Sequence, residues 1–344
     1  MQTNSQNRRQ FLRRMASASA GVGAVLGRAT FVSAEQKSLT PRSEPIGDPD
    51  VPLEVILLGT GSPGIVLDEQ RGGACEIVLA YGEPLLFDLG HLGLTHLAKA
   101  GLHPNDIRRV FFTHTYHYDH FCDFDGFMQI RALRRAPRQR PNTQSGQRPP
   151  RKPTRQAAQQ PVGGAGPLYV YGPADTKDRI DLVLRRVYAE DIRAKNLVRR
   201  DVVKVQVADE GIACESEKWK VASTHVKHGP NALGYRIDAG GKSVAISGDV
   251  AEPSKDPDRP GRIVGFPCES MERLARGTDL FIIDACGRHS TPKELAAAVV
   301  RANPRKVVLT HVQSTASGII YRDKMKEVYE GEVIIAKNLM RIRV

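Results

Sequence analysis

Residues 111–120 have the sequence FFTHTYHYDH. It places three histidines and one aspartate within seven positions, directly after an apolar run. Neutral imidazole and carboxylate are the ligands that zinc and similar divalent ions take in proteins, and a strand that ends in a loop can direct such side chains at one centre. We therefore predict that His117, Asp119 and His120 bind metal. The alternative is a polar loop whose histidines form hydrogen bonds with the backbone.

Three further candidate ligands each stand close to the end of an apolar run that is typical of a strand. They are His228, which precedes a glycine turn, Asp249, which follows SVAISG, and His311, which follows KVVLT. Strands that each deliver one ligand at their carboxyl ends can meet at one edge of a sheet. Each residue alone could be structural, but the set predicts a metal cleft at such an edge.

Patterns of strand, turn and helix alternate through the body of the chain. Strands are predicted at 53–58, 75–80, 85–88, 109–113 and 168–171, and a helix is predicted at 95–100. Such alternation favours sheets that are covered by helices. The chain holds 344 residues, of which 40% are hydrophobic and 26% are charged, so one large domain at 51–344 can bury a substantial core.

The positive charge of the chain is concentrated in two segments. The formal net charge is +12, but residues 1–34 contribute five arginines and residues 131–160 contribute nine cations, both without any acidic residue. The remainder of the chain therefore carries −2, which argues against a broad surface for nucleic-acid phosphates. The five cysteines are scattered and odd in number, so a disulfide framework is not expected.

Residues 131–166 are rich in arginine, glutamine and proline and poor in apolar residues. This composition is typical of a disordered insertion. Because runs of like charge are usually solvated, we expect a loop without a specific partner. An arm that binds RNA or another polyanion stays open as the alternative.

The N-terminus carries a basic stretch, NRRQFLRR at residues 7–14, followed by an apolar run rich in alanine and glycine. With the small residues that end at Ala34, this pattern resembles a twin-arginine export signal and its cleavage site. The run is short and contains Arg28, so no stable membrane span is expected. We therefore predict a signal peptide at 1–34, a linker at 35–50, and export to the periplasm or the medium by the twin-arginine machinery. A basic disordered tail is the alternative.

The order and spacing of these motifs resemble those of the metallo-β-lactamase superfamily, in its ribonuclease Z and arylsulfatase branch. The resemblance extends over 55–344 without the insertion. It rests on LGTGSP at 58–63, LFD at 86–88, the histidine cluster, HGPNALGYR at 228–236, GD at 248–249, HST at 289–291 and LTH at 309–311. The resemblance implies a fold of the α+β class, an αββα sandwich of two mixed sheets flanked by helices.

The resemblance also implies two divalent ions in a cleft at the sheet edge, zinc in the first place, with manganese or iron as alternatives. Carried over to this sequence, it assigns His117 and His228 to the first ion, Asp119, His120 and His311 to the second, and Asp249 to both. Two such ions lower the pKa of a shared water and so supply a hydroxide, which Asp119 and Asp249 would orient.

Two positions depart from the family pattern. The pattern His-x-His-x-Asp-His requires a histidine where this chain has Thr115, and His114 stands one position early. Because side chains alternate along a strand, we expect His114 to point away from the metal, and to be a ligand only if the backbone bulges. The first ion would then bind weakly or be missing. The family run His-Glu-Ala-Thr corresponds to IDAC at 283–286, in which Asp284 retains a carboxylate.

His289 matches the family histidine that donates a proton to the leaving oxygen or stabilises its charge. The resemblance thus implies that Asp119, Asp284 and His289 are catalytic. The run HST at 289–291 can also be interpreted as a helix start, with Ser290 as the N-cap, and the two interpretations can hold together.

These observations lead to an exported metal-dependent hydrolase that cleaves a small ester-type anion, either a phosphodiester or a sulfate ester. A ribonuclease Z-type endoribonuclease is the alternative. Bacterial members of that type carry a long arm between the residues that match His228 and Asp249, whereas only 21 positions separate them here. A non-catalytic or weakly metal-binding scaffold is a third hypothesis, which Thr115 and Ile283 favour. The oligomeric state stays open, with a homodimer among the alternatives.

Overall fold

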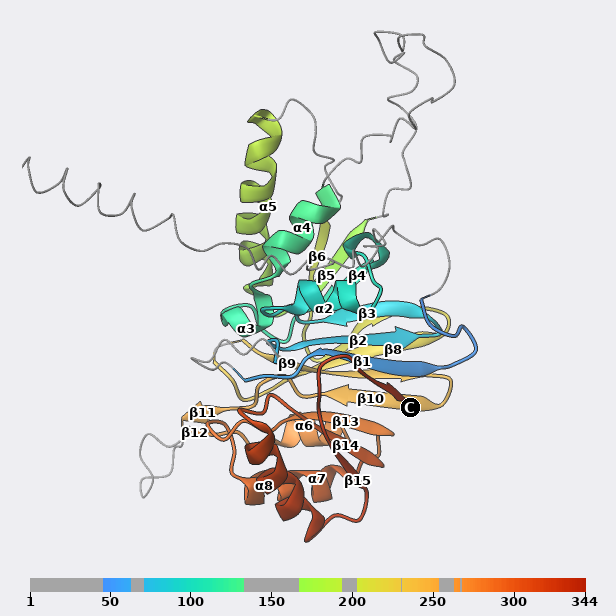
Figure 1. The fold of residues 1–344 in the computed structure, drawn as a ribbon, viewed down its shortest axis with the longest axis vertical. Coiled ribbons are helices and arrows are strands. Elements are labelled where there is room, and N and C mark those ends of the chain that lie inside the picture. The colour runs from blue at the N-terminus through green and yellow to red at the C-terminus, as the bar shows by residue number, and fades with distance from the viewer. Residues whose placement is uncertain are drawn as a thin grey trace, which may run out of the picture. The chain divides into compact units, whose positions relative to one another are not determined.

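The computed structural model describes residues 46–62, 71–132, 167–193, 203–229, 231–253, 263–266 and 268–344, all within the compact unit Leu39–Val344. In this unit two seven-stranded sheets lie face to face, and helices cover the outer face of each sheet (Figure 1). The fold is therefore the αββα sandwich of the α+β class that the sequence predicts. The predicted signal peptide at 1–34, most of the linker and residues 133–166 of the basic insertion lie outside the described residues.

The first sheet has the strand order β16-β1-β2-β3-β4-β5-β6. Its strands are β1 (Leu53–Gly59), β2 (Cys75–Ala80), β3 (Glu83–Phe87), β4 (Arg109–Phe111), β5 (Leu168–Gly172), β6 (Val203–Val207) and β16 (Met340–Arg343). Strands β1 and β3 are each antiparallel to β2, and β3 is parallel to β4. Consequently β1, β3 and β4 all end at the same edge of the sheet, which brings the residues that follow them close together.

The second sheet has the strand order β15-β14-β13-β10-β9-β8-β7. Its strands are β7 (Gly211–Glu215), β8 (Trp219–His225), β9 (Leu233–Ala239), β10 (Lys242–Ile246), β13 (Leu280–Asp284), β14 (Lys306–Thr310) and β15 (Glu332–Ile335). Strands β10, β13 and β14 are parallel, and β8 shares their direction because both β8 and β10 are antiparallel to β9. Their carboxyl ends deliver the predicted ligands to one edge. A separate two-stranded sheet pairs β11 (Glu252–Pro253) with β12 (Ile263–Val264).

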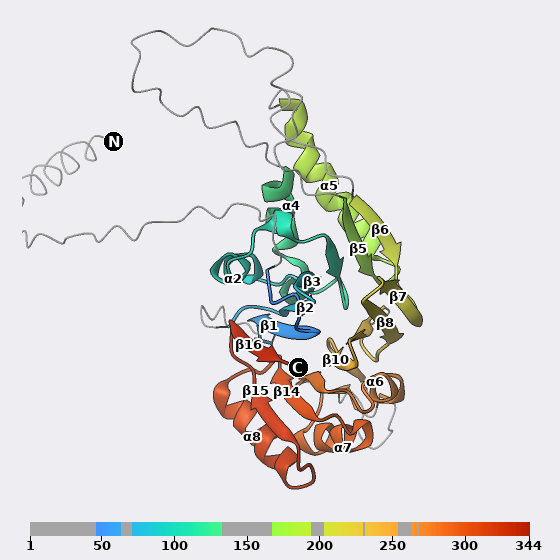
Figure 2. The same ribbon diagram turned by 90° about the vertical axis from the view of Figure 1, so that its right-hand side faces the viewer.

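Apolar side chains fill the space between the sheets and the space under the helices. Between the sheets, Phe87, Phe111 and Tyr171 stack with ring centroids 4.8 and 4.7 Å apart. The outer face of the first sheet packs against α2 (Gly93–Lys99), α4 (Phe124–Ala132) and α5 (Thr176–Arg193), and that of the second sheet against α6 (Glu269–Leu274), α7 (Pro292–Ala302) and α8 (Thr315–Lys326) (Figure 2). None of the helices in the described part of the chain is long and apolar enough to cross a membrane.

Helix α4 continues to Ala132 and so includes Arg131, which the sequence analysis assigns to the basic insertion. The side chain of Arg131 is buried, and its guanidinium donates hydrogen bonds to the carbonyl oxygens of Pro104, at 2.7 Å, and Ile107, at 2.6 Å. Pro104 begins the 3-10 helix η1 (Pro104–Asp106). A buried guanidinium with two carbonyl acceptors belongs to the folded domain. The start of the predicted insertion therefore moves from 131 to beyond Ala132.

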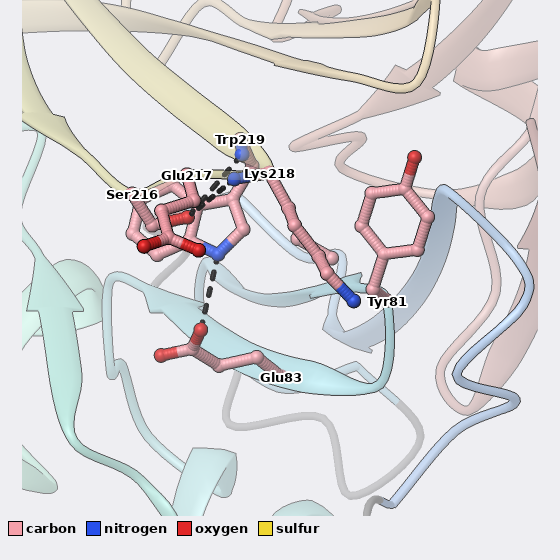
Figure 3. A pocket seen from close by; sticks show the side chains of 7 residues that line it. Tyr81, Glu83, Ser216, Glu217, Lys218 and Trp219 are labelled. Atoms are coloured by element: carbon pink, nitrogen blue, oxygen red, sulfur yellow. Dashed lines mark hydrogen bonds between the residues drawn. The ribbon is translucent and has the colours of Figure 1, made fainter.

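The two sheets are tied together at the end where β3 and β8 begin. A cavity of about 300 Å³ at this end is lined by residues that include Tyr81, Glu83, Lys218 and Trp219 (Figure 3). Trp219 Nε1 donates a hydrogen bond of 3.0 Å to Glu83 Oε2, which joins a strand of the second sheet to a strand of the first. The predicted metal ligands, all of them described residues, are not part of this cavity.

Candidate metal centre

The histidine-rich stretch follows β4, which ends at Phe111, two residues earlier than predicted. A loop leads from there into the short helix α3 (Tyr118–Phe121). Thr113 anchors this loop, because its backbone N–H and its hydroxyl donate to the carboxylate of Asp88, at 2.8 and 2.7 Å. His120 Nδ1 donates to the same carboxylate at 2.8 Å. A histidine that is held by a carboxylate presents its Nε2 in a fixed direction, which is the usual arrangement around a metal ligand.

The first group of candidate ligands joins residues from both sheets. Its members are His114, His117, His228 and Asp249, whose ligand atoms all lie within 4.8 Å of one another. His117 Nδ1 lies 3.3 Å from His114 Nε2 and 3.4 Å from His228 Nε2. His228 Nε2 in turn lies 3.5 Å from Asp249 Oδ2. Three imidazoles and one carboxylate therefore surround a common point.

The second group contains Asp119, His120 and His311, again with all ligand atoms within 4.8 Å of one another. Asp249 borders this group as well, because its Oδ1 lies 3.1 Å from His120 Nε2 and 3.2 Å from His311 Nε2. One oxygen of Asp249 thus faces the first group and the other faces the second. This is the geometry of a carboxylate that bridges two cation sites.

Several ligand atoms of the second group are buried without hydrogen bonds. Within the described residues, no partner of suitable geometry is found for both carboxylate oxygens of Asp119 and Asp249, nor for the Nε2 atoms of His120 and His311. Proteins rarely leave buried polar atoms unpaired, and each such atom costs about 1–3 kcal/mol. Divalent cations in the two groups would satisfy all of them, so the residues present fit a metal. The fold and these groups together indicate a divalent-metal site.

The expectation that His114 points away from the metal was wrong. His114 is fully buried among the ligands of the first group, whereas Thr115 Oγ1 donates to Asp175 Oδ2, at 3.0 Å. The physical reason is that β4 ends at Phe111, so the alternation of side chains along a strand does not extend to positions 114 and 115. His114, and not the residue at position 115, is therefore the candidate ligand here.

His289 and Asp284 form a hydrogen-bonded pair beside Asp249. His289 Nδ1 donates to Asp284 Oδ2 at 2.5 Å, and His289 Nε2 lies 4.0 Å from Asp249 Oδ2. Asp284 is itself fixed by the backbone N–H groups of Cys286, at 2.8 Å, and Val250, at 3.2 Å. The pair therefore presents the Nε2 of His289 to the metal centre in a defined orientation.

The helix start that was the second interpretation of HST at 289–291 is also present, but its cap differs from the expected one. Thr291, and not Ser290, is the N-cap of α7, and it forms a capping box with Glu294. Ser290 Oγ instead accepts a hydrogen bond from the backbone N–H of Phe266. The motif therefore serves both the site and the helix, as the sequence allows.

Burial and charge set the protonation of the site. Burial lowers the pKa of His228 to about 4 and also holds the pKa of His114 well below its usual range. Burial alone would raise the pKa of Asp249, but His311 and His120 outweigh it and hold this pKa well below its usual value. Burial alone would lower the pKa of His289, but the Asp284 carboxylate raises it to about 9. Burial alone would lower the pKa values of His120 and His311, but Asp249 outweighs it and raises both. Neutral imidazoles and an ionised carboxylate are the forms that bind cations, so a cation at the second group must displace protons from these two histidines.

The backbone is strained where it delivers two of these ligands. His311 has φ = +59°, a left-handed conformation that is uncommon for residues other than glycine and that clusters at functional sites. Gly248, directly before Asp249, has φ = +58°, and a Cβ there would lie 2.7 Å from the Cβ of Thr113. Only glycine allows this close approach between the two sheets.

Asp88, Thr113 and Tyr116 support the site, although the sequence patterns predict no role for them. Asp88 and Thr113 hold His120 and its loop, and the Tyr116 hydroxyl donates to the carbonyl oxygen of His228 at 2.9 Å. The signal in the sequence is the position of Asp88. A carboxylate that directly follows a buried strand, at the edge where the histidines also lie, is a candidate support for a ligand.

Comparison with known proteins identifies the family. Residues 53–273 match the model of the metallo-beta-lactamase superfamily, which is more than half of the chain. The chain therefore belongs to the metallo-beta-lactamase superfamily, as its motifs suggest.

Individual relatives are more distant. Ribonuclease Z of Bacillus cereus strain B4264 is 24% identical over 326 residues, which cover 81% of this chain and 94% of that protein. The short form of human tRNase Z has a similar structure, with a TM-score of 0.56 and 21% identity over 84% of this chain and 98% of that one. The metallo-beta-lactamase fold protein YhfI of Bacillus subtilis gives a TM-score of 0.57 and 16% identity over 85% and 99%. The family, its ribonuclease Z relatives and the ligand groups together support a metal-dependent hydrolase.

Proposed function

We propose that the protein is an exported metal-dependent hydrolase that cleaves an ester-type anion, a phosphodiester or a sulfate ester. The observation that carries this proposal is the position of Asp249 between two groups of ligands, with one oxygen toward each. Such a site can hold two divalent ions, zinc in the first place, with manganese or iron as alternatives. When bound, the ions would neutralise the ester anion and lower the pKa of an attacking water.

The residues of the site would then have different roles in the reaction. Asp119, together with Asp249, would hold the cations and orient the water through carboxylate oxygens that have no other partner among the described residues. His289 Nε2 would protonate the leaving oxygen, since its Nδ1 is taken by Asp284 and its other nitrogen faces the centre. Asp284 would fix the orientation of that imidazole.

Ribonuclease Z-type cleavage of RNA is the second candidate, and the names of the curated relatives favour it. The segment between His228 and Asp249 argues against it, because it consists of strands β9 and β10 joined by a tight turn at Gly240 and Gly241. The long arm that bacterial members of that type insert here is replaced by this hairpin. We therefore place small esters ahead of RNA, and keep nucleic-acid binding through the basic insertion as a weaker alternative.

Export remains part of the proposal on the strength of the N-terminal sequence alone. The twin-arginine pattern and the small residues that end at Ala34 support translocation to the periplasm or the medium. Fractionation of cells that produce the double variant Arg8→Lys and Arg9→Lys tests the export proposal. Retention of the variant in the cytoplasm is the expected result, and unchanged export would contradict a twin-arginine route.

A substrate panel on the full-length protein tests the activity. The protein is loaded with zinc or manganese and compared with a chelated sample on bis(p-nitrophenyl) phosphate, p-nitrophenyl sulfate and a precursor tRNA. We expect metal-dependent hydrolysis of at least one of the two small esters. Preferred cleavage of the precursor tRNA would favour the ribonuclease Z alternative. A protein that binds no metal after loading would favour the third hypothesis, a scaffold without activity.

A further inference from the structure

A second cavity, of about 600 Å³, opens directly beside the first ligand group. One wall comes from the segment after β8 and includes Lys227 and His228, and the other comes from α6 and includes Glu269, Ser270 and Arg273. His228 belongs both to this cavity and to the first ligand group, so the cavity borders the candidate metal centre. Its volume falls within the range of ordinary ligand pockets, about 300–1,000 Å³.

Helix α6 holds its wall of the cavity rigidly. Met271 is fully buried in the outer core, and Glu272, which is 4% exposed, accepts two hydrogen bonds from Arg301 of α7, at 2.6 and 2.8 Å. Ser270 Oγ donates to the carbonyl oxygen of His225 at 2.5 Å, which ties the helix to the end of β8. Arg273 therefore projects from a helix that is fixed on both sides, as a residue that recognises a ligand should.

The cavity contains an arginine that forms no ion pair within the described residues. Arg273 is exposed, and within the described residues its guanidinium has no acidic partner and no hydrogen bond, in contrast to the paired Arg301. His225 forms a hydrogen bond with Asp209 at 2.5 Å, and Glu269 is the one carboxylate among the described residues that line the cavity. The cavity therefore contains a guanidinium that is available to a ligand.

We propose that this cavity binds a second anionic group of the substrate, remote from the ester that is cleaved, and that Arg273 determines specificity for that group. The inference rests on the proposed function, because the cleaved ester is the one at the metal centre. A guanidinium offers a planar pair of donors that matches phosphate and carboxylate, and it keeps its charge at all relevant pH values. The preferred substrates are then diesters that carry a further phosphate or carboxylate, and simple aryl sulfates, which lack one, are poor substrates.

Three matched chromogenic esters test the subsite on the full-length, zinc-loaded protein. They are thymidine 5′-(p-nitrophenyl phosphate) with a 3′-hydroxyl, a 3′-phosphate or a 3′-O-carboxymethyl group, so that the leaving group is the same in all three. We expect kcat/KM to be higher for the two esters with a second anion. Arg273→Gln should lower kcat/KM of these two about five- to tenfold, mainly through KM, and leave the 3′-hydroxyl ester nearly unchanged. Glu269→Gln should raise kcat/KM of the same two esters by about twofold.

Two further measurements separate recognition from structure. Arg276→Gln is the matched control, because Arg276 is exposed just beyond the same helix but does not line the cavity, and it should change none of the three rates. Calorimetric titration with thymidine 3′,5′-bisphosphate should show the same loss of affinity in Arg273→Gln, with zinc content as in the parent protein.

The possible results distinguish a failure of the subsite proposal from a failure of the proposed function. Equal rates of the parent protein on all three esters, or an equal loss on all three in Arg273→Gln, would overturn the subsite while hydrolysis itself stands. If no ester is hydrolysed but the bisphosphate still binds in a manner that depends on Arg273, the subsite holds and the proposed function fails.

Discussion

The two ends of the sandwich differ in whether their carboxylates have partners, although the same strands connect the two ends. Strands β3 and β8 begin at one end with Glu83 and Trp219 and end near the metal centre. At the first end the carboxylate of Glu83 accepts from Trp219 Nε1 and forms an ion pair with Arg109, whose guanidinium also lies 5.0 Å from the Trp219 ring centroid. At the other end, the carboxylates of Asp119 and Asp249 have no hydrogen-bonding partner in the described part of the chain.

This difference distinguishes polar groups that stabilise the fold from polar groups that are available to bind a ligand. Buried polar atoms without partners each cost about 1–3 kcal/mol, so the ligand atoms at the metal end destabilise the fold in the absence of a cation. A cation that binds to these atoms in the folded state would remove this cost and stabilise the fold. The carboxylate of Glu83, whose side chain is 37% exposed, already has its partners and needs no ligand.

The largest effect is expected from Asp249→Asn. This change removes the charge that both ligand groups share, so bound metal should fall at both sites and the rate of ester hydrolysis should fall by about 10³-fold or more. Elemental analysis of the zinc-loaded, full-length variant measures the first effect. Asp238→Asn, which alters a carboxylate paired with Arg236 on β9, is the control and should retain metal. Full metal content in Asp249→Asn would show that Asp249 does not bridge.

His289→Ala should have the next largest effect, and it should act on the chemistry alone. Loss of a positioned proton donor typically costs about 10²–10⁴-fold in rate, and the loss should be largest for esters with poor leaving groups. Asp284→Asn should give a smaller loss of the same kind, because it loosens the imidazole without removing it. Rates on a series of leaving groups, together with metal analysis, check this. Equal losses across the series, or loss of metal, would show that His289 is structural or a ligand.

Much of the fold and of the site can be predicted from the sequence, because both follow from strand ends. Apolar runs such as KVVLT predict buried strands, and in parallel strands the next residue lies at a shared edge, so His311 and Asp249 are found where they are expected. The residue types and the spacing of the histidine cluster predict that it binds metal. These signals are local and need no knowledge of distant contacts.

The remaining features depend on contacts between segments far apart in the chain. Thr115 is turned away from the metal by Asp175, which is 60 positions away, and His120 is held by Asp88, 32 positions away. Neither contact produces a periodic pattern in the sequence from which it could be predicted. The end of β4 at Phe111 is equally hidden, since the apolar run continues to Phe112, and this boundary decides whether His114 faces the metal.

His114→Ala and Thr115→Ala form a matched pair of neighbours that tests this boundary. Because His114 belongs to the first ligand group, its loss should weaken zinc binding at that site by about 10- to 100-fold, at least as much as the loss of a supporting residue. Thr115→Ala should leave zinc affinity nearly unchanged, since its hydroxyl is bonded to Asp175. Titration against a competing chelator measures both affinities. The opposite order of effects would mean that the strand continues and that position 115 faces the metal.

The smallest effect on activity is expected at the opposite end of the sandwich, with Glu83→Gln. The amide can still accept from Trp219, but the ion pair with Arg109 loses its charge, so the free energy of unfolding should fall by about 1 kcal/mol while metal content and turnover stay the same. Urea denaturation of the zinc-loaded protein measures this change, and Glu83→Ala should cost more because the Trp219 N–H then loses its acceptor.

If Glu83→Gln released metal, the two ends would be coupled through β3, and the contrast between a structural end and a ligand end would fail. If instead Asp249→Asn raised the stability of the metal-free protein while Glu83→Gln lowered it, the contrast would be sharpened. The buried charge of Asp249 would then destabilise the metal-free protein, whereas the charge of Glu83 would stabilise it.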